Sequence, residues 1–492
     1  MNTQIRRLGV AMVTLFVVLF VAVNYIQVWD SSAIANNPAN SRLIIQQFDV
    51  DRGDILAADQ RTVLAKSVET TGRLKFLRRY PQGPLYAHIT GFFSVKCGRK
   101  RLESTYNDLL GARATELLST TFEDELLNRP KRGATVVTTI DPNLQEVAFQ
   151  QLSDNAPHGG AVVAMDPSTG EIEAMVTIPR FDPNSVTVRN LGDEQDACRR
   201  LNANDGRLLK SDATDEVFPP GSTFKLIDLS AALENGLTLH TQMPNPHELD
   251  LPQTEQQLEN FGGEHCSGGA PKITLEDAFV ESCNVTFGEL GLKLGAQALF
   301  DQARAYGFDQ HVPFDIPFNE GQFNEPSFFE DRLPAIAFSA IGQQDVRANP
   351  LQMALVASAI ANGGTEMEPH LVKEIRYPNG SVLKSFGPSV FGHPISPQTA
   401  VDMTRVMTEV VQRGTGTAAQ IPGVTVAGKT GTAQTESGAP HAWFVCFAPA
   451  EHPTIAVAVV VLNGGNLADE ATGGHVAAPI ARAVIEAALG KG

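Results

Sequence analysis

The stretch FPPGSTFKL at residues 218–226 joins a sharp turn to the start of an apolar helix. Two prolines and a glycine favour the turn, and the helical pattern then continues to a stop at Asn235 and Gly236. Ser222 is therefore predicted at the helix N-terminus, where the helix dipole favours developing negative charge. Lys225 lies three residues later on the same face. A helix that is apolar nearly all round desolvates this lysine, which lowers its pKa toward that of a usable base.

Taken alone, the Ser-x-x-Lys spacing also fits a serine N-cap followed by a surface lysine.

A second candidate is the triplet Ser282-Cys283-Asn284, after a helix start at residues 274–277 that resembles a capping box. A hydroxyl and an amide two residues apart both face a cleft if the backbone between them is extended. The alternative is an ordinary polar turn between two helices.

A third candidate, GKTGTA at residues 428–433, overlaps a nucleotide-binding pattern. Residues 423–430 (GVTVAGKT) match G-x-x-x-x-G-K-[ST], a loop that needs a strand before its first glycine and a helix after its end. Here Pro422 precedes the first glycine, β-branched residues lie between the glycines, and another glycine follows Thr430. Residues 424–434 are therefore predicted to form one strand of a hairpin that returns through residues 442–447. Nucleotide binding is disfavoured.

Strand patterns at two distant places predict a single sheet. Residues 161–165 and 171–176 indicate a β-hairpin, and residues 455–462 (IAVAVVVL) are typical of a buried central strand. Helical patterns lie between them at residues 223–234, 275–294, 351–361 and 398–412, and a last helix is predicted over 475–489. Strands at both ends with helices between them predict an α+β fold in which distant segments share a sheet.

Composition bounds the class of protein. The chain has 492 residues, of which 42% are hydrophobic and 19% charged, as in a folded protein with a large core. A net charge of −17 argues against a nucleic-acid partner. Residues 71–133 are the basic exception, with 12 Lys and Arg against 6 Asp and Glu, which indicates a domain boundary near residue 134. In that region a charged stretch at residues 102–127 is predicted to be helical.

The five cysteines and eleven histidines show no metal-ligand spacing, so neither a metal nor a cofactor is expected.

Residues 8–28 carry no charge and span roughly 30 Å as a helix, about one bilayer core. Arg6 and Arg7 precede them, so the positive-inside rule keeps the N-terminus cytoplasmic and everything after residue 30 outside. The alternative is a cleaved signal peptide, for which Ala-Ile-Ala at residues 33–35 fits the cleavage pattern. That site lies well past the apolar run, which favours an uncleaved anchor.

The motifs SxxK, SxN and KTG occur in this order at residues 222–225, 282–284 and 429–431, the set found in penicillin-binding proteins and class A β-lactamases. With them, the chain resembles a class B penicillin-binding protein of the penicillin-binding protein A type of actinomycetes, a cell-division D,D-transpeptidase. Matching segments extend over nearly the whole chain, among them RGDI (52–55), RYP (79–81), TID (139–141), IGQ (341–343) and PLQMA (350–354). The chain departs from the pattern at Gln344-Asp345, where many relatives have a second glycine.

The resemblance implies the architecture. We expect a penicillin-binding or serine β-lactamase-like transpeptidase domain, with a sheet flanked by helices, preceded by a mixed pedestal domain and one transmembrane helix. The expected boundaries are residues 1–30 for the cytoplasmic N-terminus and anchor, 31–154 for a pedestal similar to penicillin-binding protein dimerisation domains, and 155–492 for the transpeptidase domain.

The resemblance also implies roles for the motif residues. Ser222 would attack the carbonyl of the penultimate D-alanine of a stem peptide, Lys225 would take its proton, and Ser282 would relay protons to the leaving group. Asn284 would hold the substrate amide. Backbone N–H groups of Ser222 and Thr432 would form the oxyanion hole.

In the third motif, Lys429, Thr430 and Thr432, with Gly431 between them, would bind the terminal carboxylate of the substrate or of a β-lactam. An acceptor amine from a neighbouring peptide would then take the acyl group and form a crosslink. β-Lactams would acylate the same serine and stay there.

Three other functions share these motifs: a β-lactamase, a D,D-carboxypeptidase and a division scaffold with an inactive site. Because no glycosyltransferase domain fits in residues 30–155, we expect the protein to work with a glycosyltransferase of a division or elongation complex. The other expected partners are stem peptides, β-lactams and the cell membrane, crossed once with the catalytic domain outside the cytoplasm.

Exported thiols tend to oxidise, and a count of five leaves at least one cysteine unpaired. Cys283 is the middle residue of the second motif, and Cys266 lies 17 positions earlier between glycine pairs that let the chain fold back. A Cys266–Cys283 disulfide is therefore predicted. The alternative is a reduced Cys283 packed as a small apolar residue.

Overall fold

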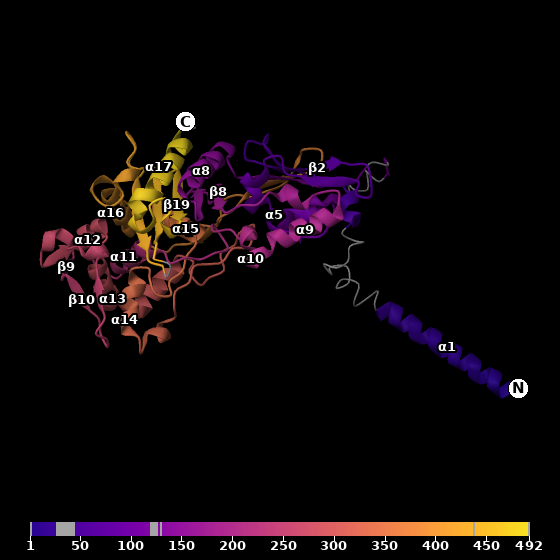
Figure 1. Ribbon diagram of the computed structural model, residues 1–492, viewed down its shortest axis with the longest axis horizontal. Helices are drawn as coiled ribbons and strands as arrows, with labels where there is room; N and C mark the ends of the chain where they lie inside the picture. The colour runs from indigo at the N-terminus through magenta and orange to yellow at the C-terminus, as the bar shows by residue number, and fades with distance from the viewer. Residues whose placement is uncertain (1, 26–44, 119–125, 128–129, 436–437, 491–492) are drawn as a thin grey trace.

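The computed structural model describes residues 2–25, 45–118, 126–127, 130–435 and 438–490. Its first element is α1 (Asn2–Tyr25), of which Thr3–Tyr25 is long and apolar enough to cross a membrane. None of that window is buried against the rest of the protein (Figure 1). The last residues of the predicted span, 26–28, and the cleavage pattern at 33–35 lie outside the described residues.

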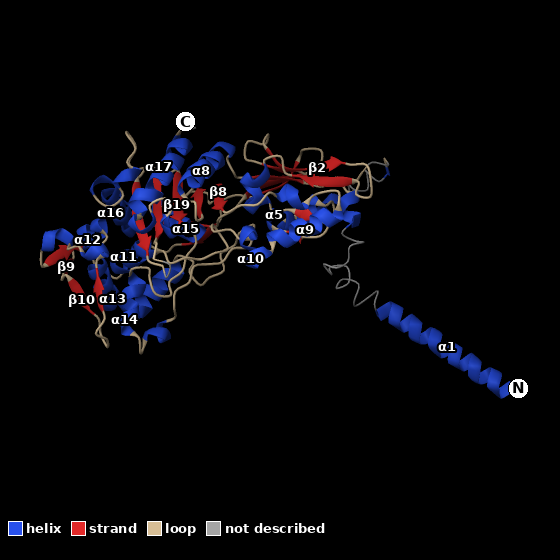
Figure 2. Ribbon diagram, in the orientation of Figure 1, coloured by secondary structure: helices blue, strands red, loops and turns tan. Residues whose placement is uncertain are grey.

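A five-stranded antiparallel sheet forms the centre of the larger part of the molecule (Figure 2). In spatial order its strands are β17 (Ala427–Ala433), β18 (His441–Ala448), β19 (Ile455–Val461), β7 (Gly160–Met165) and β8 (Ile172–Ile178). The predicted hairpin and central strand are both present, and β19 is buried along its whole length. The expectation of an α+β fold with distant segments in one sheet is confirmed, because β19 pairs with β7.

Alternate side chains of this sheet enter two separate cores, because successive residues of a strand point to opposite faces. Val457 of β19 belongs to the cluster formed with α8 (Pro142–Asn155) and α17 (Ala478–Leu489). Its neighbour Ala458 belongs to the cluster formed with α15 (Pro350–Ala361). Helices thus cover both faces, and the sheet is held rigid from both sides.

A helical lobe lies beside β17, the edge strand of this sheet. Its helices are α11 (Lys225–Glu234), α12 (Leu275–Glu281), α13 (Asn284–Ala305), α14 (Leu333–Ala340) and α16 (Pro397–Arg413). Two small hairpins complete it, formed by β9 (Gln242–Pro244) with β12 (Lys272–Thr274) and by β10 (Glu248–Asp250) with β11 (Gln257–Glu259). The helical pattern predicted over residues 275–294 is divided into α12 and α13 at Ser282 and Cys283.

A second sheet, of six strands, forms the part that follows the N-terminal helix. Its order is β15 (Val382–Ser385), β14 (Val372–Arg376), β6 (Thr135–Thr138), β1 (Ile55–Leu56), β2 (Val63–Glu69) and β3 (Phe76–Arg79). Strands β14 and β15 come from far along the chain, and β14 pairs with β6 in antiparallel fashion. No single residue number therefore separates the two parts, because residues 372–385 complete the sheet begun by residues 55–138.

Short elements fill the rest of this region. They are α4 (Ala87–Thr90), β4 (Phe93–Ser94), β5 (Gly98–Arg99), α5 (Arg101–Thr105) and α6 (Asn107–Leu110), followed along the chain by α9 (Leu191–Leu201) and α10 (Ala203–Gly206). Strands β13 (Glu366–Met367) and β16 (Val390–Gly392) form a separate pair, of which β13 packs against α15. The helical stretch predicted over residues 102–127 is present up to residue 118 as the short helices α5 and α6 and a 3-10 turn at Thr115–Leu117, and residues 119–125 lie outside the described residues.

A disulfide between Cys97 and Cys198 fastens the loop after β4 to α9. The glutamate Glu194 of α9 accepts a hydrogen bond from Ser94 near the same place. Because 101 positions separate the two cysteines, no local spacing in the sequence points to this pair.

A buried charge network holds the six-stranded part together. Glu103 of α5 accepts from Arg52 Nε at 2.6 Å and from Arg78 Nε at 2.5 Å, and all three side chains are at most 3% exposed. Tyr80 donates its hydroxyl to the same carboxylate at 3.2 Å. Burial by itself would raise the pKa of Glu103, but Arg78 and Arg52 outweigh it and hold the pKa below its ordinary value.

Replacing Glu103 by alanine should therefore destabilise the protein by about 3–5 kcal/mol, because two buried guanidinium groups lose their counter-ion. Urea denaturation of the part after the membrane helix measures this, with Asp196→Ala, from an exposed pair with Arg199, as the control at below about 1 kcal/mol. Since the native pKa of Glu103 is lowered, its contribution is present above pH 4.5 and disappears as the pH falls through the native pKa. Equal losses in the two variants would contradict the assignment.

Candidate active site

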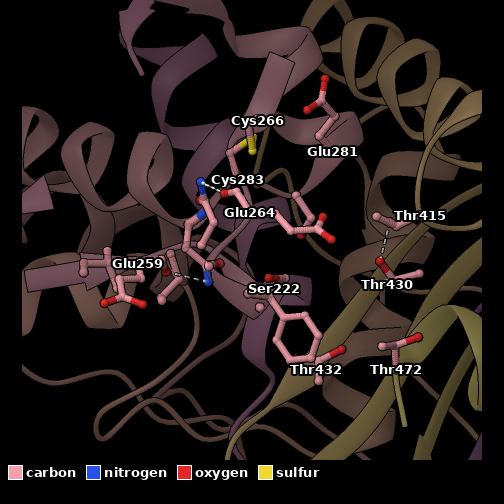
Figure 3. A pocket seen from close by; sticks show the side chains of 18 of the residues that line it. Ser222, Glu259, Glu264, Cys266, Glu281, Cys283, Thr415, Thr430, Thr432 and Thr472 are labelled. Carbon is pink, nitrogen blue, oxygen red and sulfur yellow. Dashed lines mark hydrogen bonds between the residues drawn. A yellow bond between two sulfur atoms is a disulfide. The ribbon is translucent and has the colours of Figure 1, made fainter. Parts of the chain in front are cut away.

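A cleft of about 1100 Å³ lies between edge strand β17 and the helical lobe, and side chains from all three sequence motifs line it (Figure 3). Among the lining residues are Ser222, Ser282, Asn284, Thr430 and Thr432. Segments more than 200 positions apart in the sequence therefore meet at one surface, which makes this cleft the candidate active site.

Ser222 lies in a tight turn, Gly221–Phe224, which leads directly into α11 at Lys225. A Cβ at Gly221 would press on the backbone of Thr432, so only glycine lets this turn approach β17 so closely. The indole of Trp443 donates to the carbonyl of Pro219 at 3.0 Å and fixes the start of the turn. Ser222 thus faces the cleft from just before the helix rather than from its first turn.

The amine of Lys225 is fully buried and is held by the second motif. It donates to the carbonyl oxygen of Ser282 at 2.7 Å and to Oδ1 of Asn284 at 2.8 Å, and it lies 3.5 Å from Ser282 Oγ. Burial, and then the nearby charge of Lys429, lower the pKa of Lys225 well below its ordinary value. The SxxK and SxN motifs are thus one hydrogen-bonded unit.

The backbone at Ser282 is strained. With φ 65° and ψ 39°, this serine closes α12 in the left-handed conformation, which non-glycine residues adopt rarely. Such strain persists only where surrounding contacts impose it, and it concentrates at functional sites. Here it aims the Ser282 hydroxyl between two lysine amines.

Asn260 is a positioning residue that sequence reasoning missed. Its side-chain oxygen accepts the backbone N–H groups of Asn284, at 2.7 Å, and Val285, at 3.1 Å. These are the first N–H groups of α13, which lack an intrahelical partner, and Cys283 offers no side-chain cap. Because the cap comes from 24 positions upstream, no local pattern could reveal it.

The predicted disulfide between Cys266 and Cys283 is present in the structure. Asn245 donates to the carbonyl of Cys266 at 2.9 Å, and Glu281 accepts from the backbone of Ser267 at 2.7 Å, so the segment around Cys266 is tied both to the residue that follows β9 and to the residue before the second motif. Glu281 lies within 4.8 Å of both sulfurs, but the disulfide leaves neither as a thiolate for a metal ion.

The third motif forms β17. Lys429 is fully buried and donates to Ser282 Oγ at 2.8 Å and to the carbonyl of Thr430 at 3.1 Å. Burial lowers its pKa to about 7. The Thr430 hydroxyl contacts that of Thr415 at 2.6 Å, a neighbour that the sequence did not indicate (Figure 3).

The phosphate-loop alternative does not fit this geometry. Residues 427–433 are a strand paired along its whole length with β18, not a loop followed by a helix. A Cβ at Gly431 would press on Pro220 O, so this glycine serves the contact between β17 and the turn at Ser222.

The arrangement supplies a hydroxyl in an open cleft, two buried amines that share a second hydroxyl, and the free edge of a strand. Those are the elements of nucleophilic acyl transfer: a nucleophile, a base of lowered pKa, a proton relay and backbone donors for an oxyanion. The structure brings all eight motif residues to this cleft or its wall: Ser222, Lys225, Ser282, Asn284, Lys429, Thr430, Gly431 and Thr432.

Two family models match the sequence: "Penicillin binding protein transpeptidase domain" over residues 160–486 and "Penicillin binding protein A dimerisation domain" over residues 52–136. The chain is 38% identical to the peptidoglycan D,D-transpeptidase PbpA of Mycolicibacterium smegmatis, over the full length of both. It is 39% identical to PbpA of Mycobacterium tuberculosis, over 99% of each chain. The solved structure of penicillin-binding protein A from M. tuberculosis as a ceftriaxone acyl-enzyme superposes with a TM-score of 0.86 at 39% identity, covering 90% of this chain and all of that one.

Removing each disulfide should lower the free energy of unfolding, but only removal of Cys266–Cys283 should loosen the start of α13. In the chain-entropy model, removing the Cys97–Cys198 bond by a double serine substitution costs about 4.7 kcal/mol, and removing Cys266–Cys283 costs about 3 kcal/mol. Only the second change should raise the hydrogen-exchange rates of the Asn284 and Val285 amides relative to the rest of the protein. Urea denaturation and amide exchange on both double variants check this. Unchanged exchange at α13 in the Cys266→Ser/Cys283→Ser variant would show that Asn260 alone fixes the motif.

Proposed function

The chain belongs to the penicillin-binding protein transpeptidases, and we propose that its acyl-enzyme forms on Ser222. The protein is a serine-type peptidoglycan D,D-transpeptidase. The observation that carries the assignment of residues is the convergence of Lys225 and Lys429 on the Ser282 hydroxyl at the wall of the cleft that exposes Ser222.

In the first half-reaction, Ser222 Oγ attacks the carbonyl of the penultimate D-alanine of a stem peptide. Lys225 accepts the serine proton, because its buried amine has a lowered pKa and therefore carries a free electron pair at neutral pH more readily than an exposed lysine. The bond between the new ester carbon and the terminal D-alanine then breaks. Serine gains the acyl group, and D-alanine leaves with a proton.

Ser282 carries that proton to the leaving amine. Its hydroxyl lies 2.8 Å from the Lys429 amine and 3.5 Å from the Lys225 amine, so a proton taken by Lys225 has a short route through it. Asn284 holds the Lys225 amine through Oδ1 and directs its amide nitrogen toward the Glu259 carbonyl at 3.3 Å, at the mouth of the cleft. It is the group that orients a substrate amide.

Strand β17 binds the substrate backbone and its terminal carboxylate. Because β17 is the edge strand of the sheet, no strand among the described residues pairs with its outer N–H groups, and that of Thr432 joins that of Ser222 as an oxyanion donor. Lys429, Thr430 and Thr432 supply the charge and hydroxyls for the carboxylate. An acceptor amine from a second stem peptide then attacks the ester, restores Ser222 and forms the crosslink.

The N-terminal helix supports a single-pass membrane anchor with the remainder outside the cytoplasm, as the flanking Arg6 and Arg7 favour. We propose residues 1–30 as the anchor, 31–154 as the pedestal and 155–492 as the transpeptidase domain, with two exceptions at the boundary: α8 packs on the five-stranded sheet, and the later strands β14 and β15 complete the pedestal sheet. We also propose that the protein acts in cell-wall synthesis and division together with a separate glycosyltransferase. Its proposed ligands are stem peptides and β-lactams.

Ser222→Ala should abolish covalent labelling by fluorescent penicillin and leave the melting temperature unchanged, because only one hydroxyl is removed. Lys225→Ala should slow labelling by roughly a hundredfold or more through loss of the base. Gel fluorescence and intact-mass analysis check both. A stable wild-type adduct supports a transpeptidase, whereas rapid turnover indicates a β-lactamase and no adduct indicates an inactive scaffold. Wild-type labelling by Ser222→Ala would overturn the assignment of the nucleophile.

The rate constant of penicillin acylation should follow a bell-shaped pH profile that lies wholly below pH 10.5. The rate rises with pH as Lys225 loses its proton and becomes a base, and falls as Lys429 loses the charge that binds the carboxylate, with a pKa of about 7 in the free protein. Lys429→Ala should acylate more slowly and lack the descending limb. Stopped-flow acylation kinetics between pH 5 and pH 10 measure this. A rate that climbs steadily toward pH 10.5 would mean that Lys225 is an ordinary exposed lysine and not the base.

A further inference from the structure

Gln344 has a backbone conformation that suits glycine. Its φ is +58°, in the left-handed region that a residue with a Cβ rarely adopts, and a glutamine has no short side chain to bond its own backbone there. The side chain is exposed and lines the active-site cleft together with Ser222, Phe338 and Ile341. A glycine at position 344 would relieve the backbone strain, yet the chain has a long polar side chain there.

The turn that carries Gln344 is fastened to the turn that carries Ser222. Gly221 donates its N–H to the carbonyl of Gly342 at 3.0 Å, and a Cβ at Gly342 would overlap the Gly221 backbone. On the other side, Arg347 Nη1 donates to the Gln344 carbonyl at 2.8 Å. Both ends of the turn are thus held, and Gln344 keeps a set place on the cleft wall, in a turn fastened to the one that carries Ser222.

The carboxamide itself has no structural partner. Within the part of the chain that the structure describes, it makes no hydrogen bond, so burial or a fold-stabilising contact does not explain the strained backbone. Strain of this kind, imposed by neighbouring contacts and placed at a binding surface, indicates a functional role. A carboxamide both donates and accepts hydrogen bonds, which matches a peptide amide.

We infer that Gln344 is a specificity-determining residue that hydrogen-bonds a backbone amide of the stem peptide bound over Ser222. The inference rests on the proposed function, because it takes Ser222 as the site of acylation. Gln344 recognises the peptide beyond the reacting carbonyl, so a small β-lactam, which lacks that peptide, does not need it.

Gln344→Gly and Gln344→Ala test this, with Gln253→Gly as the matched control. Gln253 is also an exposed glutamine with positive φ, 63°, but it does not line the cleft. The full-length protein in detergent is assayed for D-alanine release from a synthetic stem pentapeptide ending in D-alanyl-D-alanine, for acylation by benzylpenicillin, and for melting temperature.

Both Gln344 variants should lose roughly three- to tenfold in kcat/KM for the pentapeptide, mainly through KM, as expected for one uncharged hydrogen bond. Penicillin acylation should stay within about twofold of wild type, and Gln344→Gly should melt no lower than wild type, because glycine relieves the strain. Gln253→Gly should match wild type in both reactions.

Unchanged pentapeptide turnover in both Gln344 variants would overturn the inference, and so would an equal loss toward penicillin, which would mean that the turn acts on Ser222 itself. Failure of wild-type protein to form a penicillin adduct would instead refute the proposed function, so the two failures are distinguishable.

Discussion

The structure depends on one hydroxyl held between two buried amines. Ser282 Oγ lies 2.8 Å from Lys429 and 3.5 Å from Lys225, and both lysines are excluded from water. Two ammonium groups so close in a poorly solvated site repel each other, and burial also favours their neutral forms. That environment lowers the pKa of both lysines, to about 7 for Lys429. The same environment makes the site costly to assemble, so it requires rigid support.

The support comes from three directions, and each acts on the backbone rather than on the reacting groups. The Asn260 side chain caps α13, the Cys266–Cys283 disulfide ties the second motif to the preceding loop, and the glycines Gly221 and Gly431 let the turn at Ser222 approach β17. Because these contacts over-determine the segment, Ser282 keeps a left-handed conformation that it would leave in a free chain. Precision here arises from backbone constraints that are far apart in the sequence.

Local sequence patterns predicted the elements whose formation depends on neighbouring residues. The hairpin at residues 160–178, the buried strand β19 and the helix after Ser222 follow from periodicity and turn residues, and the ordered motifs indicated the family. The polar triplet at residues 282–284 suggested a turn between two helices, but the helical pattern continued through it from residue 275 to residue 294. The sequence therefore did not locate the end of α12 and the start of α13. The Asn260 cap and the Cys97–Cys198 bond depend on groups that only tertiary folding brings together, so no periodicity could reveal them.

Strands β14 and β15 give the molecule a mechanical property. Both strands follow α15 in the chain, and α15 packs against the central strand β19. Strand β14 joins the pedestal sheet by pairing with β6. A pedestal attached only by a flexible linker transmits no torque, whereas one that shares a hydrogen-bonded ladder does. Any rotation of the pedestal, whether from the membrane or from a bound protein, must therefore either break that ladder or pull on the segment that leads back to the core beside the cleft.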